Sequence, residues 1–143
     1  MTFTHLPPPT LDDPAADERT GPFWDAAHDH RLVAPRCVDC GTFRMPPGRF
    51  CPQCLSMNLE YVDVPGTGTV FAAIVVREAL HRGAEEHVPY VAALIEADGA
   101  PGIRFVSNVV DCEVDEVTIG MPVRVVFHPV NERFTLPLWT RAL

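Results

Sequence analysis

The stretches Cys37-Val-Asp-Cys40-Gly and Cys51-Pro-Gln-Cys54 form two Cys-x-x-Cys knuckles, separated by residues 41–50. Each knuckle can direct two thiolates to one point, and two knuckles together close a tetrahedral four-sulfur site of the zinc-ribbon kind. Rubredoxin-like iron is the alternative metal, because the same four sulfurs would also hold iron. A pair of redox dithiols is a further alternative. A redox knuckle, however, usually occurs singly at a strand-to-helix junction, and no helical pattern follows either knuckle here.

The predicted metal site is structural. Four cysteines on one metal leave no coordination position open, whereas a catalytic zinc keeps one position for water. The site would hold together residues 35–56, a segment too poor in apolar side chains to fold alone. Its predicted ligands are all the cysteines of the two knuckles, namely Cys37, Cys40, Cys51 and Cys54.

The composition leaves room for a small metal module and a barrel of about a hundred residues. The chain has 143 residues, 47% of them hydrophobic, and its 15 prolines and 9 glycines favour loops and short strands over long helices. It contains no apolar run of about eighteen residues and no N-terminal signal pattern, so we expect a soluble, cytoplasmic protein that does not bind membranes. The remaining cysteine, Cys112, has no basic neighbour and is expected to be an inert thiol.

The charge pattern disfavours nucleic acid as a partner. The formal net charge is -8, and all 11 basic residues are arginines. A phosphate backbone repels such a chain unless its arginines are strongly segregated. Some arginines do gather around the knuckles, where they could offset the charge of the metal-thiolate cluster. Alternatively they could form a phosphate or carboxylate site for a ligand, because the guanidinium fork suits either anion. These arginines are Arg31, Arg36, Arg44 and Arg49.

The N-terminal third divides into an arm and a helix. Residues 1–19 are rich in proline and acidic side chains and predict a flexible arm, which is either a frayed tail or a segment that orders on a partner. Residues 20–34 predict a short helix with Thr20 as its N-cap. Phe23 and Trp24 form a small apolar patch on this helix, which either packs on the rest of the chain or binds a partner.

The remaining chain is predicted as a zinc ribbon over residues 35–60 and a mainly β domain over residues 61–143. Gly68 is the expected bulge or bend, and the acidic insertion before the fourth strand should point Val114, Val117 and Ile119 inward. A closed five-stranded barrel of the OB type accounts for these features better than an open antiparallel sheet, because the strands lack lysines that would protect edges. The expected strands span residues 66–76, 89–96, 103–110, 122–127 and 134–140. The last of these, with the run Leu136-Pro-Leu-Trp139, either closes the barrel or lies against a partner.

An ordered set of short motifs resembles domain-of-unknown-function family 35. The set begins with Phe23-Trp24-Asp25 and includes the two knuckles. It continues through Pro46-Pro47, Gly66-x-Gly68-Thr69-Val70, Pro89-Tyr90 and Ile119-Gly120-Met121-Pro122-Val123. The resemblance covers about residues 20–130, and Leu55 departs from it because the family often has glycine after the last cysteine.

The resemblance implies a non-catalytic accessory or scaffold subunit. Family members have a rubredoxin-like zinc ribbon and an OB fold, and they associate with thiolase-fold enzymes, lipid-transfer-protein-like aldolases or MaoC-like hydratases. The resemblance therefore implies a structural zinc and acyl-CoA as a ligand shared with the partner in a hetero-oligomer, in steroid side-chain or fatty acyl-CoA metabolism. On this basis Phe23 and Trp24 are predicted to form the partner or acyl-chain surface, and Arg36, Arg44 and Arg49 to contact the CoA phosphates.

Two other function classes compete with this interpretation. An OB-fold nucleic-acid-binding protein is the main alternative, since both zinc ribbons and OB barrels serve that role. A stand-alone enzyme acting on an acyl thioester is a third class, with His81, His87 and His128 as candidate catalytic residues, each of which is expected on a loop or the surface. The sequence contains no nucleophile elbow and no phosphate-cradling glycine loop, which favours a non-catalytic role.

Overall fold

Strands dominate the part of the chain that the computed structural model describes, residues 2–6 and 17–142. Its elements are, in chain order, α1 (Gly21–His28), β1 (Val33–Cys37), β2 (Leu59–Asp63), β3 (Thr67–Val76), the 3-10 helix η1 (Glu85–His87), β4 (Tyr90–Ala97), β5 (Phe105–Val110), the 3-10 helix η2 (Val114–Glu116), β6 (Pro122–Pro129) and β7 (Thr135–Arg141). The expected mainly β fold with one short N-terminal helix is confirmed. None of the described helices has the length and hydropathy to cross a membrane.

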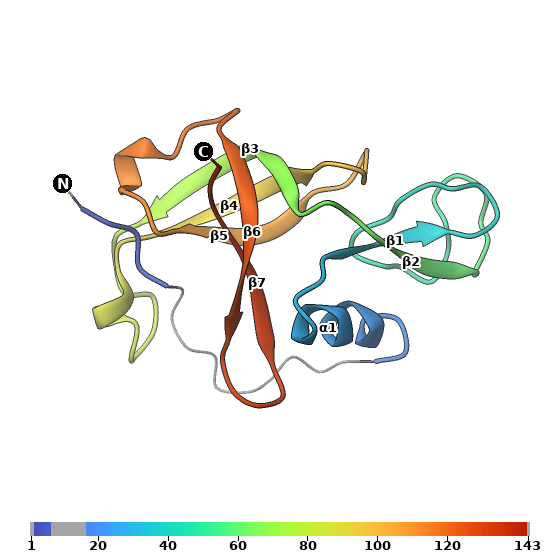
Figure 1. Ribbon diagram of the computed structural model, residues 1–143, viewed down its shortest axis with the longest axis horizontal. Helices are drawn as coiled ribbons and strands as arrows, with labels where there is room; N and C mark the ends of the chain where they lie inside the picture. The colour runs from blue at the N-terminus through green and yellow to red at the C-terminus, as the bar shows by residue number, and fades with distance from the viewer. Residues whose placement is uncertain (1, 7–16, 143) are drawn as a thin grey trace.

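The ribbon is built on an antiparallel pair, β1 and β2, with Val33 opposite Asp63 and Cys37 opposite Leu59. The two knuckles lie in the loops between these strands, and the whole unit extends to one side of the barrel with α1 beneath the junction (Figure 1). β1 begins two residues before the expected start of the ribbon at residue 35, and β2 continues three residues past its expected end at residue 60. Pairing of the chain before the first knuckle with the chain after the second was not expected from the sequence.

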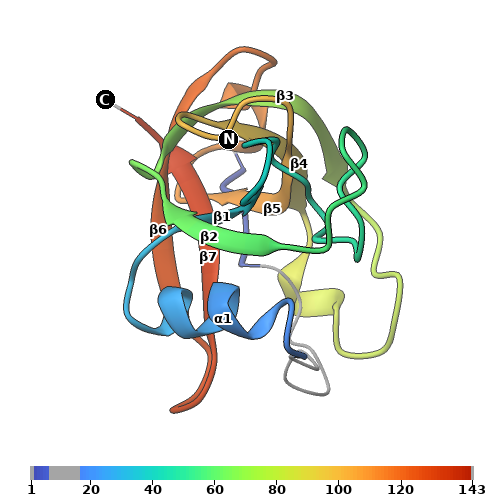
Figure 2. The same cartoon turned by 90° about the vertical axis from the view of Figure 1, so that its right-hand side faces the viewer.

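The barrel closes in the order β3-β4-β5-β7-β6, as predicted for an OB fold. Antiparallel pairs make up most of the ladder, and β5 runs parallel to β7 over Val109 and Val110 alone. Viewed from the ribbon end, the five strands wrap around one core (Figure 2). At the seam, residues 67–69 of β3 pair with residues 122–124 of β6, so closure shortens the sheet edges that lysines would otherwise protect.

Alternation of side chains along the strands creates the barrel core. In β4, every second residue from Val91 to Ala97 is buried, because successive side chains in a strand point to opposite faces. Trp139 of β7 is 1% exposed and is the largest fully buried side chain of the core in the described residues. The run Leu136–Trp139 therefore belongs to the strand that closes the barrel.

The expected bulge at Gly68 and the expected inward side chain of Ile119 are both wrong. The register shift in β3 lies between Val70 and Ala72, not at Gly68. Gly68 instead allows the backbones of β3 and β4 to approach closely, since a Cβ there would lie 2.4 Å from the Glu96 carbonyl oxygen. Ile119 was expected to point inward, but its side chain is 76% exposed because it lies in the turn that enters β6.

The N-terminal residues 2–6 lie against the barrel, in contrast to the flexible arm that was expected. The Thr4 N–H donates to the Cys112 carbonyl at 2.8 Å, and the Val114 N–H donates to the Thr2 carbonyl at 2.8 Å. Residues 7–16, the proline-rich part of the predicted arm, lie outside the described residues. The burial of Cys112 beneath this contact agrees with an inert thiol, and burial together with the nearby Glu116 carboxylate raises its pKa.

Candidate metal centre and neighbouring surfaces

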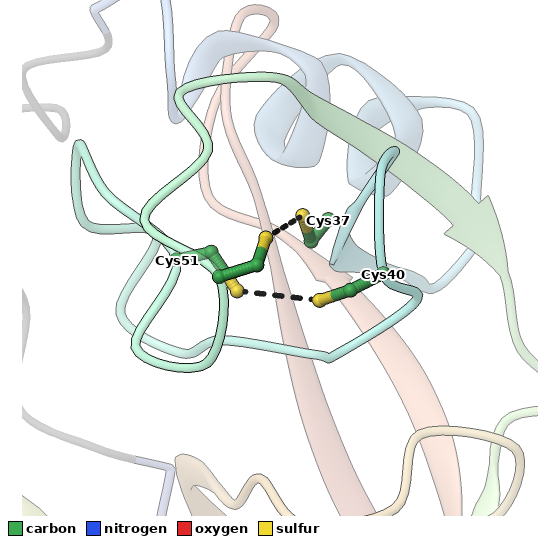
Figure 3. Close-up of side chains that lie close together, drawn as sticks. Cys37, Cys40 and Cys51 are labelled. Carbon is green, nitrogen blue, oxygen red and sulfur yellow. Dashed lines mark hydrogen bonds between the residues drawn. The ribbon is translucent and has the colours of Figure 1, made fainter.

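The four knuckle cysteines converge on one point. Their sulfurs all lie within 4.8 Å of one another. Cys37 Sγ lies 3.6 Å from Cys54 Sγ, and Cys40 Sγ lies 3.5 Å from Cys51 Sγ (Figure 3). Zinc–sulfur bonds of about 2.3 Å in a tetrahedron require sulfurs about 3.8 Å apart, so the four side chains fit a tetrahedral metal.

Each knuckle is shaped by the same backbone hydrogen bond. In the first, the Gly41 N–H donates to the Cys37 carbonyl at 2.9 Å; in the second, the Leu55 N–H donates to the Cys51 carbonyl at 2.9 Å. The residue after the last cysteine of each knuckle has a left-handed backbone, with φ of 79° at Gly41 and 65° at Leu55. The two halves are therefore near copies, which presents two pairs of thiols to a shared centre.

A small polar network joins the two knuckles. The carboxylate of Asp39 accepts hydrogen bonds from the Ser56 hydroxyl and, at 3.0 Å, from the Asn58 side-chain amide. The same network contributes to the lowered pKa of Asp39, chiefly through Ser56. Asp39 belongs to the first knuckle and both of its partners follow the second, so these bonds fix the distance between the two cysteine pairs.

The four thiols share one small volume and cannot all ionise easily without a cation. Burial acts to raise the pKa of Cys37, yet the backbone N–H groups of Cys40 and Asp39 lower it to about 6. The pKa of Cys54 rises to about 12: the Ser56 N–H acts to lower it, but burial and the neighbouring sulfurs raise it further. A bound dication would remove this conflict, because coordination deprotonates a thiol outright.

The arginines predicted around the knuckles divide into two groups. Arg31 pairs with Asp63 at 2.7 Å, and Arg36 pairs with Glu60 through Nη2 at 2.6 Å. Both ion pairs therefore link β2 to β1 or to the residues just before β1. Arg44 and Arg49 instead line a cleft of about 590 Å³ beside the ribbon, to which Arg19 also contributes. The structure brings Arg44 and Arg49 together and separates them from the other two.

The aromatic pair of α1 packs against the barrel. Phe23 stacks on Phe105 with ring centroids 6.1 Å apart, and Trp24 meets Phe134 edge-on at 5.1 Å. Both residues stay partly exposed and line a shallow, mainly apolar pocket of about 110 Å³ between α1, β5 and β7. β5 and β7 pair over only two residue positions, and α1 packs beside this short contact through Phe23 and Trp24. Thr20 occupies the predicted N-cap position but makes no capping hydrogen bond with its side chain.

Comparisons with known proteins match both halves of this architecture. The family model described as "ChsH2, rubredoxin-like zinc ribbon domain" matches residues 24–60, and "ChsH2, C-terminal OB-fold domain" matches residues 61–128. A DUF35 domain-containing scaffold protein of Methanocaldococcus jannaschii is 36% identical over 102 residues, covering 71% of this chain and 70% of that protein. The chain belongs to the DUF35 family.

Two further similar proteins carry the names of enzymes or enzyme subunits. A probable enoyl-CoA hydratase alpha subunit of Thermomonospora curvata is 38% identical over 98% of this chain, which spans only 43% of that protein's length. A solved chain of an "Ltp2-ChsH2(DUF35) aldolase" superposes with a TM-score of 0.80 at 37% identity, covering 91% of this chain and 99% of that one. The resemblance seen in the sequence is therefore confirmed at the level of the family.

One contact of this DUF35 chain had no signal in the sequence. The Tyr61 hydroxyl on β2 donates a hydrogen bond to the Arg19 carbonyl, which ties the segment before α1 to the ribbon. Burial, followed by the nearby charge of Asp17, raises the pKa of Tyr61 to about 12, while the Arg44 charge acts to lower it. Only the folded chain brings these residues together, since 42 positions separate Arg19 from Tyr61.

Proposed function

We propose that this DUF35 chain is a non-catalytic scaffold subunit that binds a thiolase-fold enzyme of the lipid-transfer-protein-like aldolase type and helps it handle acyl-CoA. The observation that carries the proposal is the superposition over 99% of the matched chain of the Ltp2-ChsH2(DUF35) aldolase. A thiolase or a MaoC-like hydratase is the alternative partner. Similarity to an enoyl-CoA hydratase alpha subunit supports the hydratase. The acyl group, whether a steroid side chain or a fatty acyl chain, stays a prediction from the resemblance.

We further propose that the four-cysteine centre holds a structural zinc. Cys37, Cys40, Cys51 and Cys54 would supply all four ligands, which leaves no position for water or substrate. Zinc there would stabilise the loops between β1 and β2, since the ribbon contains few buried apolar side chains besides the cysteines themselves. The reacting groups would then belong to the partner enzyme.

Two surfaces are proposed to serve the complex. The exposed parts of Phe23 and Trp24, with the pocket beside them, would meet the partner or the acyl chain. Of the three arginines predicted to contact CoA phosphates, Arg36 already pairs with Glu60, so that role falls mainly to Arg44 and Arg49.

Co-expression with a lipid-transfer-protein-like aldolase tests the scaffold role. We expect the zinc-loaded chain to co-purify with the aldolase and to raise its solubility or its cleavage of an acyl-CoA substrate. If the two proteins elute separately, and the same holds for a thiolase and a MaoC-like hydratase, the scaffold proposal fails. Turnover of an acyl-CoA by the chain on its own would contradict the non-catalytic role.

A further inference from the structure

Arg44 is the one buried charged residue in the described part of the chain. It is only 5% exposed, and the other buried polar residues there are Thr135 and Thr140. Its Nε donates to the Gly48 carbonyl at 2.9 Å, whereas its Nη1 is buried and has no hydrogen-bond partner among the described residues. A guanidinium stays charged at any ordinary pH, and a charge taken out of water is costly unless an opposite charge lies nearby. Arg44 therefore needs a source of negative charge inside the ribbon.

Carboxylates do not supply this charge. Within residues 2–6 and 17–142, no ion pair joins Arg44 to an acidic side chain. The neighbouring arginines do not share the problem, because Arg31 and Arg36 each pair with a carboxylate, at 2.7 Å and 2.6 Å, and Arg49 is exposed to water. Arg44 thus differs from the other arginines of the ribbon.

Residues 42–44 pair with β1 as a short third strand of the ribbon sheet. The Cys37 N–H donates to the Thr42 carbonyl at 2.8 Å, and the Arg44 N–H donates to the Pro35 carbonyl at 3.1 Å. In this antiparallel register Cys37 lies opposite Thr42, and Pro35 lies opposite Arg44. Side chains two residues apart in a strand point to the same face, so Thr42 and Arg44 share the face of Cys37. Arg44 is the diagonal neighbour of Cys37 on this face, and such neighbours lie about 7–8 Å apart.

Two further observations agree with this placement. Thr42 Oγ1 lies 3.2 Å from Cys40 Sγ, so the face that Thr42 and Arg44 share is the face of the sulfurs. Tyr61 lies opposite Pro35 on the other side of β1 and therefore points the same way. Burial, followed by the Asp17 charge, raises the pKa of Tyr61, and the Arg44 charge acts to lower it. The guanidinium thus acts on this face of the ribbon.

We infer that Arg44 is the buried countercharge of the metal–thiolate centre and raises the affinity of the four cysteines for their metal. A zinc ion cancels only two of the four thiolate charges, so the loaded centre carries an excess of negative charge. That excess is the partner that Arg44 lacks, and groups behind the ligands tune a metal site in this way. The inference rests on the structural zinc proposed above and is independent of the coenzyme A role of Arg44 and Arg49.

Competition for zinc between the full chain and the chelator 4-(2-pyridylazo)resorcinol tests this role. Arg44→Met removes the charge and keeps an unbranched stem, so we expect the zinc affinity to fall about tenfold or more, the usual cost of losing a group behind the ligands. Arg44→Lys keeps the charge but loses the Nε donor to Gly48, and it should retain most of the affinity. Arg49→Met removes an equal charge from an exposed position in the same loop and should have little effect, because water and salt screen that charge.

Iron-loaded protein gives a second measurement, which a purely structural role of Arg44 would not change. Reduction of ferric to ferrous iron adds one electron from the electrode to the four-sulfur centre, so a buried cation beside the centre favours the reduced form. Arg44→Met should therefore shift the reduction potential to a more negative value, and Arg44→Lys should restore it. Voltammetry of the wild type and the two variants measures the shift.

The variants separate the charge of Arg44 from its packing. Equal zinc affinities for wild type and Arg44→Met would overturn the inference, as would an unchanged iron potential. Equal losses in Arg44→Met and Arg44→Lys would also overturn it, because the effect would then belong to the Gly48 contact. If Arg44→Met does not fold, Arg44→Lys decides: zinc retained at wild-type affinity supports the countercharge, and zinc lost contradicts it. A wild-type chain that binds no zinc would refute the proposed zinc itself, whereas failure of the inference alone leaves the wild type with its metal.

Discussion

Leu55 adopts a backbone conformation that suits glycine. Its φ is 65°, and its side chain is 74% exposed, so no internal contact offsets the strain. A left-handed backbone costs a residue other than glycine about 1–2 kcal/mol of stability, which glycine would recover. Glycine also gives the unfolded chain more conformational entropy, which takes back about 0.5–1 kcal/mol of that gain. We therefore expect Leu55→Gly to stabilise the metal-loaded ribbon by up to about 1 kcal/mol. Slower amide hydrogen exchange in residues 51–58 of the variant would show this stabilisation.

The first knuckle offers the mirror experiment for this prediction. Gly41 holds the equivalent position with φ of 79°, and a Cβ there would meet no atom within 4 Å. Gly41→Leu should thus destabilise the ribbon through the backbone alone, by up to about 1 kcal/mol after the same entropy correction. Opposite signs for the two variants support the backbone explanation, and a destabilising Leu55→Gly would contradict it.

Gly68 must be glycine because the backbone of β4 leaves no room for a side chain there. An added Cβ would lie 2.4 Å from the Glu96 carbonyl oxygen and 3.1 Å from the Ala97 Cα, and neither backbone atom can move without shifting β4. Gly68→Ala should lower the free energy of unfolding of the barrel by about 1–3 kcal/mol. Urea denaturation followed by the fluorescence of buried Trp139 measures this. Gly21→Ala, where nothing lies within 4 Å, should change stability little, and equal effects of the two variants would exclude the steric cause.

Tyr61 makes the attachment of the segment before α1 sensitive to alkaline pH. Its folded pKa of about 12 lies above the ordinary tyrosine value of 10, so the unfolded chain loses the phenolic proton first as the pH rises. The contribution of Tyr61 is therefore complete below pH 10 and is lost between about pH 10 and 12. Ultraviolet titration should reveal one late-ionising tyrosine, absent in Tyr61→Phe. A phenol that ionises at pH 10 in the folded wild type would contradict the assignment.

At the scale of elements, the ribbon and the barrel obtain their stability from different sources. The barrel has a core of buried apolar side chains that includes Ile95, Val123 and Trp139. Cys37 at the end of β1, and Arg44 and Cys51 in the segment between β1 and β2, are the buried residues of the metal-binding region. Loss of the metal should consequently affect the ribbon first and leave the barrel folded.

Cys40→Ser tests this independence. We expect the variant to lose its equivalent of zinc and become sensitive to protease within residues 35–56, because three thiolates and an alcohol bind zinc poorly. The near-ultraviolet signal of Trp139 should persist. Cys112→Ser is the matched control, since Cys112 lies apart from the four-sulfur cluster, and it should keep full zinc. A Cys40→Ser protein with one zinc and an intact ribbon would show that the metal does not hold this segment.

At the scale of the whole molecule, local patterns predicted the elements, but long-range contacts decided how their surfaces are used. The knuckle spacing was sufficient for the four-sulfur cluster, and runs of residues with high β-propensity were sufficient for the five barrel strands. The division of the arginines depends on Asp63 and Glu60, which lie far along the chain from Arg31 and Arg36. The roles of Gly68 and Ile119 depend on which atoms oppose them after closure. No local pattern encodes such neighbours.

The proposed partner surface depends on this same long-range assembly, since α1, β5 and β7 each supply part of it. Val106 of β5 lines the pocket beside Phe23 and Trp24 and is 82% exposed, so Val106→Asp should leave the fold intact. A charge placed within an apolar contact must be desolvated on binding, and we expect association with the aldolase to weaken at least about tenfold. Ile119→Asp is the matched control, because Ile119 is 76% exposed and does not line this pocket. Co-purification yields and affinities for both variants measure the effect. If Ile119→Asp weakens the complex while Val106→Asp does not, the partner binds another face of the barrel.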